Sequence, residues 1–214
     1  MPPIEQIILL IPVFLLSLSS HEFAHGYASY YFGDPTPETM GRLTLNPISH
    51  LDPIGMLVLI MTQRIGWAKP VPINPRYYSN PRKDLMIVSL AGPGANFLLA
   101  VLFSIILRLM VGITGQSIGM LRFGIGTNLF RTLGTLLLLG IQINIALGIF
   151  NLLPVPPLDG SKILRGILPP RYDRYLNQLE GGLGMIILLI LAMSGMLWAI
   201  IGPIVNFFYR ILLF

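Results

Sequence analysis

The run His21-Glu22-Phe23-Ala24-His25 combines residue types and a spacing that suit a metal site. Residues four apart lie on one face of a helix, so the imidazoles of His21 and His25 can converge on one zinc ion. Glu22 follows His21 by one residue and points away from that shared face. From there it can reach a water on the metal without being a ligand, which is the placement that a general base requires. The run therefore predicts metal-assisted hydrolysis.

The run lies near the end of a stretch, residues 6–32, that is otherwise almost uncharged. Ionisable side chains at membrane depth cost about 2.5 to 3.5 kcal/mol each on insertion scales. A chain that places three of them together at that depth needs them for function. The alternative is a pair of histidines packed against helix neighbours, with Glu22 paired to an arginine.

A third ligand would come from further along the chain, where five side chains are candidates: Glu38, His50, Asp52, Asp84 and Asp159. Asp159 follows a proline-rich run directly after an apolar stretch. Prolines cannot continue a helix, and irregular backbone at membrane depth is tolerated only where it faces protein or a water-filled cavity. Asp159 is therefore expected to enter a polar pocket; its alternative role is to cap a helix that starts near Ser161. His50 and Asp52 are the second choice for the third ligand and are expected to be structural or near the substrate path. Glu38 and Asp84 lie in hydrophilic loops.

The composition predicts a membrane protein. The 214 residues are 54% hydrophobic and only 11% charged, with a mean hydropathy of +0.74, whereas soluble domains contain about 25% charged residues. The length corresponds to a single domain, residues 1–214. The absence of cysteine excludes disulfides and thiolate zinc sites, so a metal would be held by histidine and carboxylate. The net charge of +5 does not suggest nucleic acid, because the basic residues are scattered through loops.

Long apolar stretches must position these residues, and four of them predict transmembrane helices: residues 7–31, 85–111, 129–153 and 181–201. The first would be about 37 Å long as a helix, which is enough to cross a hydrocarbon core of about 30 Å. Residues 53–62 are too few to span the membrane, which favours a re-entrant or short tilted segment. After Gly202-Pro203, residues 204–214 either span partly or lie along the interface. We therefore expect an all-α polytopic membrane protein with about four to six transmembrane helices, and with membrane segments at its end, residues 181–214.

Basic residues predict the orientation, because lysine and arginine concentrate on the cytoplasmic side of a membrane protein. Residues 32–84 carry six of the fourteen, and residues 154–174 carry four more. All ten lie on one side if residues 53–62 do not cross the membrane. The amino terminus is then outside, and the ends of the first and third spans share the cytoplasmic half of the bilayer. We expect a multi-pass protein of a cell membrane, of the prokaryotic plasma membrane type, with its active site in that half.

Residues 41–75 contain two short segments that alternate with period two, 43–46 and 69–74. Such alternation is typical of strands, and the prolines at 70 and 72 confine the second segment to an edge. One hypothesis is a membrane-associated β-hairpin whose free edge holds substrate as an added strand. The alternative is a re-entrant loop that plugs the helix bundle.

Three further motifs follow the histidine run in order: Gly41-Arg42-Leu43-Thr44-Leu45-Asn46-Pro47 with His50, Asp52 and Pro53 after it, Ala91-Gly92-Pro93-Gly94-Ala95-Asn96, and residues 151–160. Together the four motifs, over about residues 15–165, resemble the site-2 protease family, zinc metalloproteases that cut the transmembrane helices of other proteins within the membrane. The chain is similar to the compact form that has no PDZ or regulatory domain. The resemblance implies a catalytic core of about residues 7–165 in which His21, His25 and Asp159 bind Zn²⁺ and Glu22 acts as base.

The resemblance also implies the partners, which are the lipid bilayer and a transmembrane protein substrate cut by regulated intramembrane proteolysis. Asn96, Asn144 and Asn151 are candidates for binding substrate or donating a hydrogen bond to the oxyanion; their alternative role is to tie helices together. The second hypothesis for the whole chain is a zinc-binding membrane protein without hydrolytic activity, either a transporter or an inactive adaptor. Glu22 favours the protease, because a binder needs no base beside its ligands. The sequence does not predict the oligomeric state.

Overall fold

The structure is a computed structural model that describes residues 4–55, 57, 68–115, 117–119 and 128–213. Within these ranges the chain forms helices, and the only β-type pairing in them is an isolated antiparallel bridge between Leu51 and Ala68. The expected all-α architecture is confirmed. The elements, in chain order, are α1 (Ile4–Tyr31), α2 (Thr36–Thr39), η1 (Pro47–His50), η2 (Pro75–Tyr77), α4 (Pro81–Thr114), α6 (Asn128–Asn151), α7 (Asp159–Ile167), η3 (Pro170–Tyr172), α8 (Asp173–Gln178), the π-helical turn η4 (Leu179–Leu183), α9 (Gly184–Met193) and α10 (Met196–Leu213).

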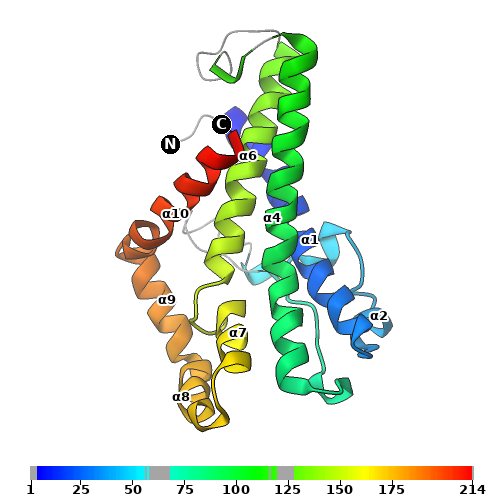
Figure 1. Ribbon diagram of the computed structural model, residues 1–214, viewed down its shortest axis with the longest axis vertical. Helices are drawn as coiled ribbons and strands as arrows, with labels where there is room; N and C mark the ends of the chain where they lie inside the picture. Colours follow the sequence, from blue (N-terminus) through cyan, green and yellow to red (C-terminus); the bar gives the residue numbers. More distant parts are fainter. Residues whose placement is uncertain (1–3, 56, 58–67, 116, 120–127, 214) are drawn as a thin grey trace.

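Three of the described helices, α4, α6 and α10, are long and apolar enough to cross a membrane. They make the chain a multi-pass membrane protein. Figure 1 shows α4 and α6 side by side along the long axis of the molecule, with α1 crossing beside α4 and with α9 and α10 on the far side of α6. The apolar stretches expected at 85–111 and 129–153 correspond to α4 and α6, which differ from them by a few residues at each end.

Local sequence explains where α4 begins and ends. The Asn80 side chain accepts a hydrogen bond from the Lys83 N–H, and the Asp84 carboxylate accepts one from the Asn80 N–H, so the two residues cap the first turn reciprocally. Pro81 occupies the first helical position, where no N–H is needed. The helix ends at Gly115, whose φ of 65° is the left-handed conformation that glycine adopts without strain.

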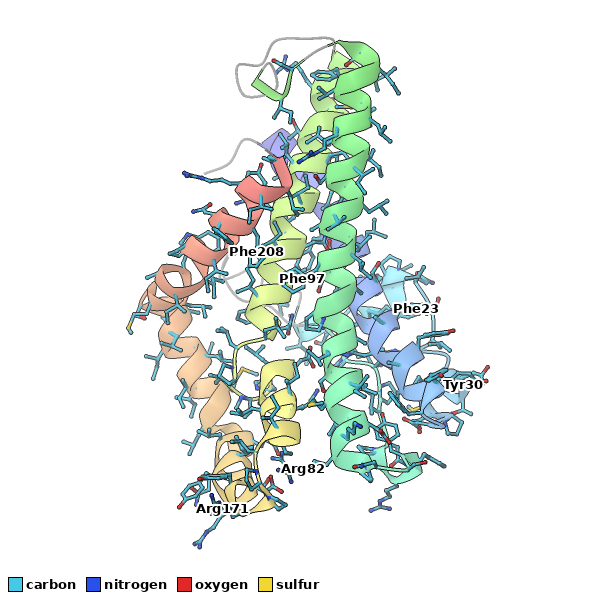
Figure 2. The ribbon with its side chains drawn as sticks, in the orientation of Figure 1. Phe23, Tyr30, Arg82, Phe97, Arg171 and Phe208 are labelled. Carbon is cyan, nitrogen blue, oxygen red and sulfur yellow. The ribbon has the colours of Figure 1, made fainter. Side chains whose placement is uncertain are left out.

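The hydrophobic core lies where α4, α6 and α10 meet. Its fully or nearly fully buried members come from all three helices: Ala100, Leu107, Ile141, Ile145, Ile149, Ile201 and Val205. Glycine allows α4 and α6 to approach closely, because a β-carbon at Gly148 would lie 2.9 Å from the Phe97 ring. On its other side Phe97 packs against Phe208 of α10, with ring centroids 6.2 Å apart (Figure 2).

The C-terminal stretch differs from the expected span at residues 181–201. Helix α9 ends at Met193, and a turn at Ser194–Gly195 separates it from α10, which begins at Met196. Gly195 has a φ of 77°, a conformation that ends a helix at low cost only in glycine. Helix α10 then continues through Gly202 and Pro203, where the sequence suggested a break. Burial of Gly202 and Val205 stabilises the helix on both sides of the proline. The boundary predicted at Gly202-Pro203 was therefore wrong.

The segment expected at residues 41–75 lies against the end of α1 and is only partly described. Residues 43–46 and 69–74 do not form a ladder with one another in the described part, because Pro47 begins the turn η1 and Pro70 and Pro72 have no N–H to donate. Most of the re-entrant stretch expected at 53–62 falls outside the described residues. The chain returns at Ala68, which pairs with Leu51, and then runs extended towards η2.

Candidate active site

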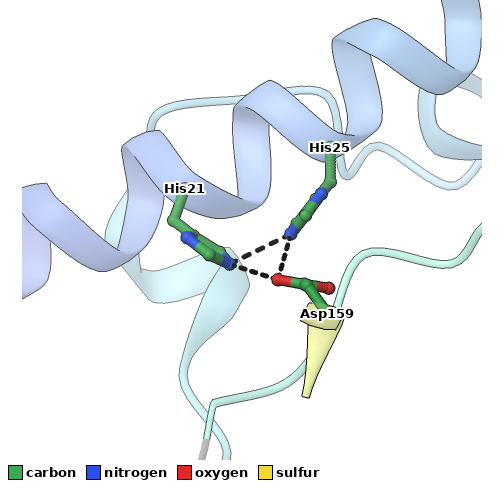
Figure 3. A group of neighbouring side chains, drawn as sticks. All are labelled: His21, His25 and Asp159. Carbon is green, nitrogen blue, oxygen red and sulfur yellow. Dashed lines mark hydrogen bonds and ion pairs between the residues drawn. The ribbon is translucent and has the colours of Figure 1, made fainter. Parts of the chain in front are cut away.

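Helix α1 presents His21 and His25 on one buried face, one helical turn apart. Their Nε2 atoms lie 3.0 Å apart and converge on the Asp159 carboxylate, as Figure 3 shows. The Asp159 Oδ2 is 3.2 Å from the His21 Nε2 and 3.1 Å from the His25 Nε2. Gly92 of α4 makes room for this arrangement, because a β-carbon there would lie 2.6 Å from the His25 Cε1 and 2.7 Å from the His21 Cε1.

Asp159 reaches the histidines because the chain turns back after α6. The helix ends at Asn151, and the run to Leu158, with a cis bond between Pro156 and Pro157, leads into the first residue of α7. Gly160 permits this turn, since a β-carbon there would overlap backbone carbonyl groups. The alternative role for Asp159, a helix cap, does not apply: α7 has Leu158 as its N-cap, and no side chain caps it.

Hydrogen bonds fix which nitrogen of each imidazole carries the proton. His25 Nδ1 is 2.7 Å from the backbone carbonyl of Val88, which can only accept, so Nδ1 is the donor. His21 Nδ1 is 2.6 Å from the Asn96 Oδ1, and that amide is oriented by its own nitrogen, which donates to the Ser17 carbonyl at 3.1 Å. With Nδ1 as the donor, Nε2 is the atom through which each ring can offer a lone pair, and the two Nε2 atoms face each other and a carboxylate oxygen.

This arrangement fits a metal ion. Three acceptor atoms within 3.2 Å of one another repel unless a shared proton or a metal cation lies between them. Ligand atoms 2.0–2.1 Å from zinc at tetrahedral angles lie about 3.3 Å apart, close to the separations observed here. His21, His25 and Asp159 are all buried, and the donor set of two imidazoles and one carboxylate is one that zinc accepts with an open fourth position.

A buried amide network holds His21 through its Nδ1, the nitrogen that does not face Asp159. The Asn96 amide donates to the Asn144 Oδ1 at 3.0 Å, and the Asn144 amide donates to the Ser17 hydroxyl at 2.8 Å. Both asparagines are fully buried and tie α1, α4 and α6 together. Asn151 is not part of this network, since its amide donates to the Leu147 carbonyl one turn earlier on α6.

The other candidate ligands lie elsewhere in the described part of the chain. His50 is fully buried, with its Nε2 2.8 Å from the Thr44 carbonyl. Asp52 accepts a hydrogen bond from the Gly55 N–H, and Asp84 accepts one from the Asn80 N–H. Both carboxylates therefore stabilise local turns of the backbone. The remaining candidate, Glu38, is exposed on α2.

Glu22 is buried next to His21 in the chain, and its Oε2 accepts a hydrogen bond of 2.8 Å from the Val71 N–H. Among the described residues its Oε1 has no hydrogen-bond partner. Sequence reasoning missed Val71, because a backbone contact between distant segments leaves no pattern of residue types. It also missed Lys162, whose Nζ is 3.4 Å from the Asp159 Oδ1, although a lysine three residues after an aspartate on a helix is a recognisable pairing.

Outside the membrane helices, a second buried polar cluster holds the chain after α1. Asp34 accepts hydrogen bonds from the Ser29 hydroxyl and from the backbone N–H groups of Thr36 and Asn74. Burial would raise the pKa of Asp34, but these hydrogen bonds outweigh it and lower the pKa below its usual range. Burial raises the pKa of Tyr78 to about 12, against the lowering effect of its hydrogen bond with Ser29.

The helices and the convergent cluster define a class of protein, the membrane proteins that carry a buried centre of histidine and carboxylate groups. Comparison of the sequence with known families narrows this class. Residues 9–195 match the model of peptidase family M50, and the chain belongs to that family. The expected membership of the site-2 protease family is confirmed, and the chain is a membrane metalloprotease by family.

Curated relatives agree with this assignment. The chain is 37% identical over 204 residues to "Putative zinc metalloprotease YwhC" of Bacillus subtilis (strain 168), which covers 95% of this chain and 89% of that protein. It is 35% identical over 189 residues to "Putative zinc metalloprotease Rip2" of Mycolicibacterium smegmatis, a match that covers 86% of this chain and 67% of that protein. "Zinc metalloprotease MJ0392" of Methanocaldococcus jannaschii is 31% identical over 119 residues, 55% of this chain and 30% of that protein. The comparison with solved structures found no match.

Proposed function

We propose that the chain is an intramembrane zinc metalloendopeptidase that hydrolyses peptide bonds within or next to the transmembrane helices of membrane-protein substrates. The observation that carries the proposal is the convergence of two imidazole lone pairs and one carboxylate oxygen within 3.2 Å, inside a bundle of apolar helices. A glutamate one residue from the first histidine completes the set of groups that peptide hydrolysis needs.

His21 and His25, through Nε2, and Asp159, through Oδ2, are the residues that would hold zinc. When bound, zinc supplies a Lewis acid that polarises the scissile carbonyl and acidifies a water molecule. The Val88 carbonyl and the Asn96 amide hold the two imidazoles in the tautomer that leaves Nε2 free. Such second partners of metal-binding histidines fix ring orientation and raise ligand basicity.

Glu22 is the proposed general base. The Val71 N–H binds its Oε2, while Oε1, which has no hydrogen-bond partner among the described residues, can take a proton from the attacking water. The same carboxyl group then returns the proton to the leaving nitrogen of the cleaved peptide bond. A base that is fixed through one oxygen and free at the other loses little conformational freedom when the reaction begins.

The charges of the site are nearly balanced. A divalent cation with ionised Asp159 and Glu22 sums to zero, which a buried site tolerates better than an isolated charge. The Lys162 ammonium lies 3.4 Å from the outer oxygen of Asp159 and is partly exposed. It stabilises the ionised form of that ligand from the side away from the histidines.

The substrate class follows from where the site lies. Buried among helices that can cross a membrane, the site is suited to segments that enter from the bilayer, and regulated intramembrane proteolysis of single-span proteins is the use we propose. We also propose that the active site lies in the cytoplasmic half of the cell membrane, as the loop charges predict.

The experiment measures zinc stoichiometry and peptide cleavage on the same detergent-purified samples. The wild-type chain is expected to bind one zinc ion and to cleave at least one member of a panel of single-span proteins. Glu22→Gln should keep the zinc but lose cleavage by about 10²- to 10⁴-fold, the usual contribution of a general base. Asp159→Asn should lose both zinc and cleavage.

These variants also separate a protease from a zinc binder without hydrolytic activity. If the wild type holds zinc yet cleaves nothing, or if Glu22→Gln cleaves as the wild type does, the proposed function is wrong. If Asp159→Asn keeps stoichiometric zinc with unchanged affinity, the ligand set is wrong.

A further inference from the structure

Arg42 is a buried arginine without a carboxylate partner in the described part of the chain. Its side chain is buried, and its Nη2 donates to two backbone carbonyls, Lys69 at 2.8 Å and Pro70 at 3.2 Å. Its Nε is buried with no hydrogen-bond partner. Burying a charged guanidinium costs free energy unless it is paired. Arg42 donates to backbone carbonyls of residues 69 and 70 instead, so its burial needs an explanation.

The reason lies in the peptide unit that Arg42 contacts. The Pro70 carbonyl and the Val71 N–H belong to one planar peptide, and in a trans peptide these two groups point in opposite directions. The carbonyl accepts from Arg42 and the N–H donates to the Glu22 Oε2 at 2.8 Å. A single peptide unit therefore stands between a guanidinium and the carboxylate of the proposed base.

The sequence around this peptide leaves it few other conformations. Pro70 and Pro72 flank Val71, so its N–H is the only backbone donor in the triplet, and the proline rings restrict the backbone on both sides. The residue before the triplet is also held, because the Lys69 N–H donates to the His50 carbonyl at 3.0 Å. The segment is thus anchored at Lys69 and presents one N–H, which points at Glu22.

Arg42 is placed by the turn before it. Gly41 has a φ of 64°, and the next two N–H groups, those of Arg42 and Leu43, both donate to the Pro37 carbonyl. This turn directs the side chain of Arg42 into the protein. The Val71 side chain completes the packing on the other side, where it contacts Gly26 of α1, one turn from Glu22: a β-carbon at Gly26 would lie 3.2 Å from the Val71 Cγ1.

We propose that Arg42 is a positioning residue for Glu22 and acts through the Pro70–Val71 peptide. The inference rests on the proposed function, because it takes Glu22 as the base. The guanidinium polarises the carbonyl, which strengthens the N–H of the same peptide as a donor. The N–H in turn holds one carboxylate oxygen of Glu22 and directs the other to the water. This assigns a role to the Gly41-Arg42 motif, which neither the ligand set nor the base explains.

The first test measures the hydrogen bond and does not depend on activity. Hydrogen exchange resolved at single residues reports the Val71 amide in the purified, zinc-loaded protein. The Asn74 amide is the internal reference, since it donates to Asp34 and not to a group that Arg42 contacts. Arg42→Gln should speed exchange at Val71 more than at Asn74, and Glu22→Ala should do the same. Val71 protection that is unchanged in Arg42→Gln would overturn the proposal.

The second test separates kcat from KM. Arg42→Gln and Arg42→Ala are expected to lower kcat by about 10- to 100-fold, the range seen when outer partners of active-site groups are removed. KM and zinc stoichiometry should change little, because neither the substrate path nor the ligands are altered. Arg42→Lys, which can still donate to both carbonyls, should retain more of kcat, and added guanidinium ion should partly restore Arg42→Ala.

Two further variants complete the design. Arg76→Gln is the matched control, because Arg76 is an exposed arginine in the same loop region, and it should keep the wild-type kcat. Val71→Pro removes the N–H and should lower kcat as Arg42→Gln does, while Val71→Ala keeps the N–H and should lower it less.

The outcomes distinguish this inference from the proposed function. A wild-type protein that does not cleave counts against the proposed function, whereas the exchange test still reports on Arg42. A wild-type protein that cleaves, with Arg42→Gln and Arg42→Ala at full kcat, overturns the inference alone. A merely structural role for Arg42 would show a different pattern and would also overturn the inference. In that case Arg42→Ala loses zinc or folding and guanidinium does not restore it. Arg42→Lys then keeps full kcat, and Val71 exchange is unaltered in Arg42→Gln.

Discussion

At the scale of single residues, each imidazole of the site is held by a bond on the side away from the cluster. His25 depends on a backbone carbonyl, which no substitution of a side chain removes, whereas His21 depends on Asn96. Asn144 and the Ser17 carbonyl together fix the Asn96 amide by accepting from its nitrogen. His21 is therefore the proposed ligand whose orientation can be weakened without changing any of the three proposed ligands.

Asn144→Ala is expected to weaken zinc binding by about 10- to 100-fold, the usual effect of removing an outer partner of a metal ligand. The cause is the loss of one of the two acceptors of the Asn96 amide: the Ser17 carbonyl remains, but the amide is held less firmly and fixes the His21 tautomer less well. Competition titration with a zinc chelator measures the affinity. Asn151→Ala, on the same helix but bonded only to the Leu147 carbonyl, is the matched control. Equal zinc affinity in the two variants would contradict the proposed support of His21.

Sequence reasoning went far at this scale for groups with a fixed spacing. The histidine pair four residues apart and the aspartate after a proline run were predicted as a cluster, and the structure brings the three together. It could not place Asn96 against His21, because hydrogen bonds between helices depend on how the helices cross and rotate. The contact of Glu22 with Val71 was invisible for a related reason: a backbone N–H is present at every residue except proline.

At the scale of elements, the region after α1 is held by an acidic side chain that acts as an acceptor. The two oxygens of Asp34 bind the Ser29 hydroxyl and the N–H groups of Thr36 and Asn74, which joins the end of α1 to α2 and to the segment before η2. These bonds require the ionised carboxylate. The lowered pKa of Asp34 means that the folded state binds its proton less readily than the unfolded chain does.

The stability that Asp34 contributes is therefore present in full above the unfolded pKa of about 3.9 and is lost as the pH falls through the lower, folded pKa. Thermal unfolding in detergent between pH 7 and pH 3 should show a melting temperature that falls at the acid end. Asp34→Asn should have a lower melting temperature than the wild type at pH 7, since hydrogen bonds to charged groups contribute about 1.5 to 3 kcal/mol. Its melting temperature should fall by fewer degrees on acidification than that of the wild type.

Glu38→Gln is the control for this experiment, because Glu38 is an exposed carboxylate on α2 only four residues away. Its melting curve should follow that of the wild type at both ends of the pH range. If Asp34→Asn and the wild type lost the same number of degrees between pH 7 and pH 3, Asp34 would not be the titrating group.

The elements themselves were predicted well where apolar stretches are long and uninterrupted, as for α4 and α6. The break in the C-terminal stretch was misplaced because the Gly202-Pro203 pair is a strong local signal for a helix end, while Gly195 alone is a weak one. Packing decides between them: Gly202 and Val205 are buried in α10, which stabilises the helix across the proline.

At the scale of the whole molecule, one end carries a cluster of charged groups. Arg82 at the start of α4 pairs with Asp173 of α8 through both of its terminal nitrogens, and Arg165 of α7 pairs with Glu180. Figure 2 shows Arg82 and Arg171 near this end, and Figure 1 shows the last turn of α4 and the first turn of α6 at the opposite end. If the end with Arg82 and Arg171 faces the cytoplasm, the last turn of α4 and the first turn of α6 face outwards.

Labelling of introduced cysteines tests this orientation, and the natural chain contains no cysteine that would react. Arg171→Cys, on an exposed position at the basic end, should react with a membrane-impermeant maleimide only after the cells are opened. Ser117→Cys, exposed in the part of the α4–α6 connection that the structure describes, should react in intact cells. Labels that appear with the opposite sidedness would reverse the proposed topology.

The separation of the proposed zinc ligands along the chain sets the earliest time at which the proposed site can be complete. His25 and Asp159 are 134 residues apart, so the ribosome must add most of the polypeptide between making one and the other. At translation rates of about 5 to 20 residues per second, this interval lasts about 7 to 27 seconds. Until it has passed, a nascent chain already threaded into the membrane lacks Asp159, so under the proposed function it cannot yet cut neighbouring proteins.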